Sequence, residues 1–147
     1  MTEERIKMSR KGAVCIVLAI AAVLLLMVVI SSIDRNAAYG KVRDAEEAAA
    51  YLAELGWEVD VSTAQVQTTI LPEYFDTTFD TYNELQKEQG FDLMEQAGKE
   101  ITVYTFQVMN YPNTTDEVLA TLMTCKNKVV GGDIHSAALD GFMHALQ

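Results

Sequence analysis

The stretch ITVYTFQVMNYPNTTDEVLATLMTCKNKVVGGDI, residues 101–134, decides the fold of this chain. Its opening residues, 101–108, have the two-residue period of a β-strand. One set of alternate positions holds Ile101, Val103 and Thr105, and the other holds Tyr104, Phe106 and Val108. Residues 110–116, NYPNTTD, are rich in turn formers and predict a loop. Residues 118–125 and 129–134 are apolar runs separated by a tight connection, which predicts a hairpin. The stretch therefore predicts an antiparallel sheet.

A helix is predicted upstream of this sheet, over residues 44–55. Asp44 and Glu47 have the spacing of a capping box, and alanine and leucine recur at helical spacing after them. Gly56 supplies the left-handed residue that ends such a helix, and Trp57 can fold back onto the last turn. This ending predicts that the indole lies in the core.

Between this helix and the sheet, residues 57–61 and 65–71 alternate apolar and polar side chains, which predicts one interrupted strand or two short strands. Pro72 ends the second run. An amphipathic helix is predicted next. Its apolar face is expected to carry Phe75, Phe79, Tyr82 and Leu85, and its solvent face Asp76, Asp80, Asn83, Glu84 and Lys87.

The remaining elements are short. A second helix ending is predicted at Gly90, and Asp92 is expected to cap a single turn. A last helix is predicted over residues 137–146, with Ser136 as its cap. The sum is an α+β fold with two or three helices packed on an antiparallel sheet, in one domain over residues 44–147.

The amino-terminal part contains GAVCIVLAIAAVLLLMVVISSI, residues 12–33, a run of 22 residues without a charge. As a helix it would be about 33 Å long, slightly more than the roughly 30 Å hydrocarbon core of a bilayer. We expect a single-pass, uncleaved signal anchor that holds the chain in the plasma membrane. Because basic residues gather in residues 1–11, this tail is predicted to be cytoplasmic. Residues 34–43 are then a linker, and residues 44–147 an extracytoplasmic domain.

Charge and cysteine content narrow the functions of the predicted domain. Residues 34–147 hold 7 Lys and Arg against 19 Asp and Glu, a net charge of −12. Because a domain with this negative charge repels phosphate polymers, no nucleic-acid partner is expected. Cys125 is the single cysteine of these residues, so it closes no disulfide within them, and its apolar flank predicts burial.

Residues with possible chemistry gather near the carboxyl end: Cys125, Asp133, His135, Asp140 and His144. The two histidines are nine positions apart, so they would face opposite sides of a continuous helix and share no metal ion. Cys125 and His135 are predicted on or just after neighbouring strands and would form a thiol nucleophile if they met, but no third orienting group is evident. We therefore predict no metal site, no cofactor and no catalytic residue.

Aromatic side chains offer a different kind of site. Tyr74, Tyr82, Tyr104 and Tyr111 have flat faces that stack on sugars or on a partner protein. Most are expected to cover the core, and Tyr111, in the loop before Pro112, is predicted to be the most exposed of them.

Five short motifs follow one another in the chain: GWEV, YNELQKEQGFDL, NYP, GGD and LDGFMH. In this order and at these separations they resemble an uncharacterised family of Gram-positive anaerobes known as domain of unknown function 4830. The resemblance spans about residues 46–146. It implies a single-pass bacterial membrane protein with an extracytoplasmic α+β module, and it supplies no catalytic residue, cofactor or substrate.

The function expected from the sequence is a membrane-anchored, non-catalytic binding or interaction module with a protein or cell-wall partner. A small thiol- or metal-dependent hydrolase of the cell envelope, using Cys125, His135 and Asp140, is the enzymatic alternative. A regulatory sensor that signals through the membrane span is the third.

Overall fold

The computed structural model describes residues 20–22, which are helical, and residues 41–147. The predicted tail, most of the predicted anchor and the predicted linker up to residue 40 lie outside the described residues. Within the described residues, no helix combines the length and the apolar character needed to cross a membrane. The chain divides after residue 38 into two units, and the second of them is described below.

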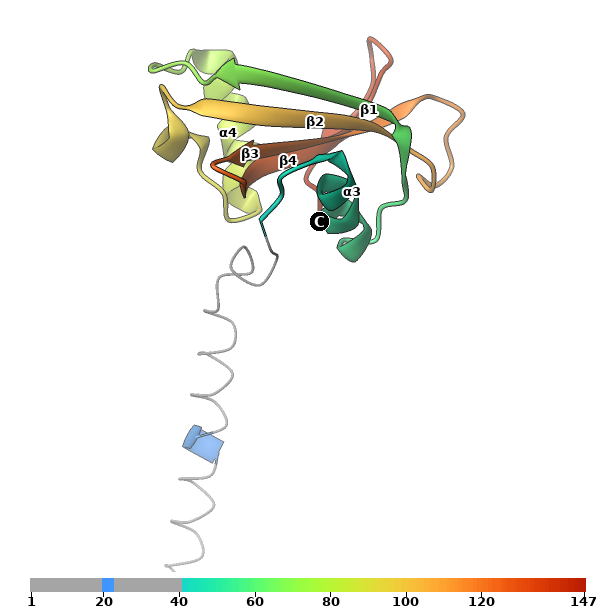
Figure 1. Ribbon diagram of the computed structural model, residues 1–147, viewed down its shortest axis with the longest axis horizontal. Coiled ribbons are helices and arrows are strands. Elements are labelled where there is room, and N and C mark those ends of the chain that lie inside the picture. Colours follow the sequence, from blue (N-terminus) through green and yellow to red (C-terminus); the bar gives the residue numbers. More distant parts are fainter. Residues whose placement is uncertain (1–19, 23–40) are drawn as a thin grey trace, which may run out of the picture. The chain divides into compact units, whose positions relative to one another are not determined.

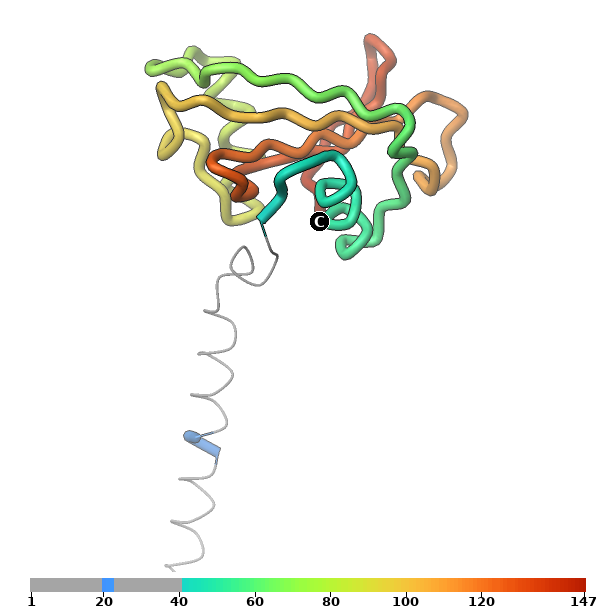
Figure 2. The backbone as a smooth tube through the Cα atoms, in the orientation of Figure 1, coloured from blue at the N-terminus to red at the C-terminus, as the bar shows by residue number. Residues whose placement is uncertain are grey.

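One antiparallel sheet organises residues 41–147 (Figures 1 and 2). Its strands lie side by side in chain order: β1 (Val59–Ile70), β2 (Glu100–Val108), β3 (Val118–Cys125), β4 (Lys128–Ser136) and β5 (Met143–His144). β1 is a single strand interrupted by a register shift between Asp60 and Gln65, which is the first of the two alternatives that the sequence left open. The hairpin of β3 and β4 is confirmed as well.

Three helices accompany the sheet: α3 (Ala45–Glu54), α4 (Thr77–Glu88) and the short 3-10 helix η1 (Leu93–Gln96). The α+β class is thereby confirmed. Asp44 caps α3 by accepting a hydrogen bond from the Glu47 amide. Gly56 ends α3 with a φ of 95°, and the Trp57 amide donates to the Leu52 carbonyl, which completes the predicted Schellman ending.

The two faces of the sheet carry different cores. On one face α3 packs against side chains such as Phe106 and Ile134, which are fully buried. The opposite face carries Ile101 and Met123, which pack with Leu93 of η1. α3 lies in front of the sheet in Figure 1 and α4 behind it. This division leaves α4 and η1 to cover the second face.

The folded domain begins earlier than the sequence indicated. Val42, which the sequence placed in the linker, is buried, and its amide donates to the Asn127 carbonyl at 2.9 Å. The connection between β3 and β4 thereby holds the entry to α3.

The predicted helix over residues 137–146 is wrong. The Ser136 hydroxyl accepts from the Ala138 amide, and the Ser136 amide donates to the Phe142 carbonyl. These bonds turn the chain back on itself, so Met143 and His144 pair with the end of β4 as β5. Ser136 therefore closes a turn, a role that competes with helix capping for this residue type.

Candidate functional site

Helix α4 buries two of its polar side chains. Asn83 is 3% exposed and Gln86 is 0% exposed, although the sequence placed Asn83 on the solvent face. The apolar stripe of Phe79, Tyr82 and Leu85 is only partly buried. Phe79 and Tyr82 still pack against the core of the second face, as the sequence predicted. The two buried amides need polar partners, because burying an unbonded polar group costs free energy.

Asn83 and Gln86 each find such partners. The Asn83 side chain accepts from the Leu93 amide at 2.7 Å and donates to the Asp92 carboxylate at 2.9 Å, which fixes the start of η1. The Gln86 Oε1 atom accepts from the Gly132 amide of β4 at 2.8 Å. The buried amides therefore dock α4 onto η1 and onto the edge of β4.

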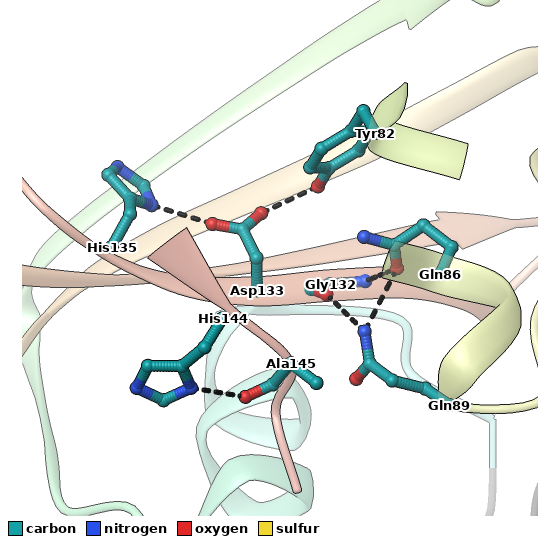
Figure 3. Close-up of polar contacts among 8 residues, drawn as sticks. All are labelled: Tyr82, Gln86, Gln89, Gly132, Asp133, His135, His144 and Ala145. Atoms are coloured by element: carbon teal, nitrogen blue, oxygen red, sulfur yellow. Dashed lines mark hydrogen bonds and ion pairs between the residues drawn. The ribbon is translucent and has the colours of Figure 1, made fainter. Parts of the chain in front are cut away.

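Gln89, one turn further along, completes the cover of this edge. Its Nε2 atom donates to the Gly132 carbonyl at 3.0 Å (Figure 3). Its Oε1 atom accepts from the Leu146 amide at 2.8 Å. Gln86 and Gln89 together bond both backbone groups of Gly132, as a neighbouring strand would. β5 is too short to reach this part of β4, so the two glutamines satisfy an edge that would otherwise lie open.

One atom of this contact has no partner. Among the described residues, Gln86 Nε2 is the buried side-chain nitrogen or oxygen atom without a hydrogen bond. In Figure 3 it points to the side on which Tyr82 and Asp133 lie. Such an atom typically costs about 1–3 kcal/mol. The docking of α4 onto the sheet therefore includes one polar group that these contacts leave unbonded.

The partly buried apolar stripe of α4 lines a cleft with a volume of about 950 Å³. Its wall is formed by α4, its floor by β2 and β3, and its rim by the end of β1 and by β5. The lining residues are largely apolar and include Leu71, Phe79, Tyr82, Leu85, Val103 and Met123. The volume falls in the range of about 300–1,000 Å³ typical of small-molecule sites.

A buried carboxylate lies beside this cleft. Asp133 is 2% exposed, and its two oxygens accept from the Tyr82 hydroxyl at 2.6 Å and from His135 Nδ1 at 2.7 Å (Figure 3). Tyr82 lines the cleft, and so does Met143, the cross-strand neighbour of His135. The Tyr82, Asp133 and His135 cluster therefore links α4 to the sheet at one end of the cleft.

The protonation of this cluster follows from its geometry. Burial, and then the negative charge of Asp133, raise the pKa of Tyr82 well above its usual value, so the phenol remains a donor. The hydrogen bond to Asp133 raises the pKa of His135, although burial alone would lower it. Because a carboxylate accepts only, His135 Nδ1 carries the proton, and in the neutral ring Nε2 is an acceptor.

The hydrogen bond between His135 and Asp133 makes the stability of the domain depend on pH. The folded-state pKa of His135 lies above its unfolded value of 6.5, so its contribution is fully present below that value and is lost as the pH rises through the folded-state pKa. We expect the stability advantage of the native chain over His135→Gln to be larger at about pH 5 than at about pH 9. Urea unfolding at both pH values measures this difference, and an advantage that grows toward alkaline pH would contradict the assignment.

Comparison with known proteins gives one match. The sequence signature described as a domain of unknown function, DUF4830, matches residues 51–134. The chain belongs to the DUF4830 family. No curated protein and no solved structure matches it. The match includes α4, the floor of the cleft and Asp133, together with four of the five motifs quoted above.

The residues proposed for an enzyme are not brought together in the DUF4830 domain. Cys125 is buried in the core near Leu93. His135 pairs with Leu119, about 20 Å from Cys125 along β3 at about 3.3 Å per residue. Asp140 is exposed in the turn before β5.

The two histidines also lie apart. His144 pairs with Ile134, so it lies on the opposite face from His135. Its ring joins Trp57, Tyr111 and Phe142 in an aromatic cluster. In the described part of the chain, no group of three or more His, Cys, Asp or Glu residues is arranged to hold a metal ion.

The aromatic prediction is corrected in part. Tyr111 is partly buried, with its ring stacked between Trp57 and Phe142, whereas Tyr74 is 87% exposed. The tyrosine that lines the cleft is Tyr82. The sequence did not predict the bond of Tyr82 to Asp133 or the roles of Gln86 and Gln89. It did carry a signal for the pair of Asp133 and His135, because residues two apart in a strand lie on the same face.

Proposed function

We propose that this DUF4830 chain is a membrane-tethered, extracytoplasmic binding module whose cleft holds a small apolar ligand. The observation that carries the proposal is the apolar cleft beside α4. The cleft has a volume of about 950 Å³, and its lining, which includes Phe79, Leu85 and Met123, is largely apolar.

The tether is supported by residues 12–33, whose uncharged run has the length of a membrane span. The basic tail before it favours a cytoplasmic amino terminus. Sidedness is tested by labelling intact cells with a membrane-impermeant maleimide. We expect Thr115→Cys, in the exposed loop before β3, to be labelled without permeabilisation, and Lys7→Cys only after it. The reverse pattern would overturn the topology.

Ligand uptake is tested on residues 39–147, a unit with its own core. The neutral fluorophore N-phenyl-1-naphthylamine serves as the apolar probe. Thr78 lines the cleft with an exposed side chain, so Thr78→Phe fills part of the cleft without altering the core. We expect this change to weaken probe binding about tenfold, which corresponds to about 1.4 kcal/mol.

Glu88→Phe is the matched control, because Glu88 is an exposed residue of the same helix that does not line the cleft. It is expected to bind the probe as the native domain does. Equal affinities for both variants would place the probe elsewhere and contradict the proposed site.

A hydrolase is the second candidate function, and the Asp133 and His135 pair favours it. A carboxylate that orients Nδ1 of a histidine and leaves Nε2 available is the arrangement of a general base. Such an enzyme would activate a water molecule and would not use Cys125. Ester turnover that is lost in His135→Gln while probe binding persists would favour this second function.

A further inference from the structure

β1 is the outermost strand of the sheet, and within residues 41–147 no other strand pairs with its free side (Figure 1). Residues 61–72 contain no charged side chain. Val66 is 53% exposed and Ile70 is 67% exposed. Proteins usually protect an edge strand with charges, prolines or bulges, because an open edge pairs readily with another strand. The regular part of this edge, Gln65–Ile70, has no charge of its own.

The direction of the backbone groups follows from the end of the strand. The Leu71 amide donates to the Lys99 carbonyl, and the Leu71 carbonyl accepts from the Gly98 amide, so both groups of Leu71 face β2. Backbone groups of alternate residues point to opposite sides of an antiparallel strand. The amides and carbonyls of Val66, Thr68 and Ile70 therefore face outward.

We propose that β1 pairs antiparallel with β1 of a second copy of this chain, about a two-fold axis at Thr68. In this register Val66 lies opposite Ile70 of the second copy, and Thr68 lies opposite its own counterpart. Each of these pairs exchanges both backbone hydrogen bonds. The most exposed apolar side chains of the edge thereby become cross-strand neighbours.

The register is set by the limits of the regular segment. The register shift between Asp60 and Gln65 lies before it, and Pro72, which has no amide donor, lies after it. An axis at Ile70 would place Pro72 opposite Thr68, and an axis at Val66 would place Ile70 opposite the irregular segment. The axis at Thr68 uses regular residues only.

A second copy fits this edge because the strand is complementary to itself. In a two-fold interface, a contact between one residue and a second residue of the other copy is repeated with the two copies interchanged. The pair of Val66 and Ile70 meets this condition. The domain is strongly acidic, but the paired segment carries no charge, so like charges do not meet within it. The pairing needs no ligand in the cleft and is independent of the proposed function.

The test is disulfide trapping in the full chain, in membranes. Gln67 would lie opposite Thr69 of the second copy as a non-hydrogen-bonded pair, with Cα atoms about 4.5 Å apart, which a disulfide can bridge. Gln67→Cys and Thr69→Cys are co-expressed with different tags and oxidised. We expect about tenfold more mixed dimer than self-dimer of either variant, because identical positions lie about 7–8 Å apart.

Two further variants check the origin of the trapped dimer. Adding Thr68→Lys to both chains places like charges opposite each other and is expected to abolish the mixed dimer, whereas Thr68→Ser is expected to retain it. Thermal unfolding confirms that each variant folds. Absence of a mixed dimer, equal trapping of all cysteine pairs, or trapping that survives Thr68→Lys would overturn the proposal.

Discussion

Gly132→Ala is expected to lower the free energy of unfolding by about 3 kcal/mol, the upper part of the usual range for overpacking a core. A Cβ atom at Gly132 would lie 2.5 Å from the Thr121 carbonyl oxygen and 2.6 Å from Leu146 Cδ1. The carbonyl belongs to the neighbouring strand and cannot move aside alone. Gln86 and Gln89 hold Gly132 from the other side, so β4 cannot shift away from β3 without losing these bonds.

The adjacent Gly131 provides the control for this prediction. A Cβ atom there would meet Gln86 Oε1 at 2.8 Å and Met123 Cε at 2.9 Å, which are side-chain atoms and not backbone atoms of a neighbouring strand. Gly131→Ala is therefore expected to cost less, about 1 kcal/mol. Urea denaturation of residues 39–147 measures both values. Equal losses at the two positions would show that the contact with β3 does not decide the effect.

Asp133→Ala is expected to lower the free energy of unfolding by about 3 kcal/mol, because it leaves two donors without an acceptor. The Tyr82 hydroxyl and His135 Nδ1 both bond to this carboxylate, and Asp133 itself is buried. The change also removes the polar link between α4 and the sheet. We expect the urea midpoint to fall with little change in the slope of the transition.

A double-mutant cycle with Tyr82→Phe isolates the link between helix and sheet. Because Tyr82 and Asp133 share one hydrogen bond, the double variant is expected to be more stable than the sum of the single losses predicts, by about 1–2 kcal/mol. His135→Gln with Tyr82→Phe serves as the comparison, since these two side chains bond to different oxygens of Asp133. Additive losses for Tyr82 and Asp133 would mean that their contact contributes nothing.

Much of the fold was predictable because its signals are local. The ending of α3 is encoded within a few residues by Gly56 and Trp57, and the strands of the hairpin are marked by their own alternation and by the turn between them. The end of the chain was mispredicted because Ser136 forms a turn as readily as a helix cap. The pairing of Met143 and His144 with the end of β4 decides between the two.

The site was less predictable because its contacts join distant segments. Helical periodicity assigns the apolar side of α4 to the core, and nothing in the helix itself indicates that Gln86 bonds to Gly132. The open edge of β4 supplies this partner, and it exists only once the sheet has formed. The bond between Tyr82 and Asp133 likewise joins residues 51 positions apart, so neither residue predicts the other.

The central claim, that the cleft beside α4 binds an apolar ligand, is tested most directly by methyl NMR. Residues 39–147 contain four methionines, which are labelled with ¹³C at the methyl group and titrated with N-phenyl-1-naphthylamine. Met123 and Met143 line the cleft from different strands, whereas Met94 and Met109 are exposed elsewhere. We predict shifts of the Met123 and Met143 methyl signals that saturate together and are lost in Thr78→Phe. Shifts confined to Met94 and Met109, or no shifts at saturating probe, would contradict the assignment of the cleft as a binding site.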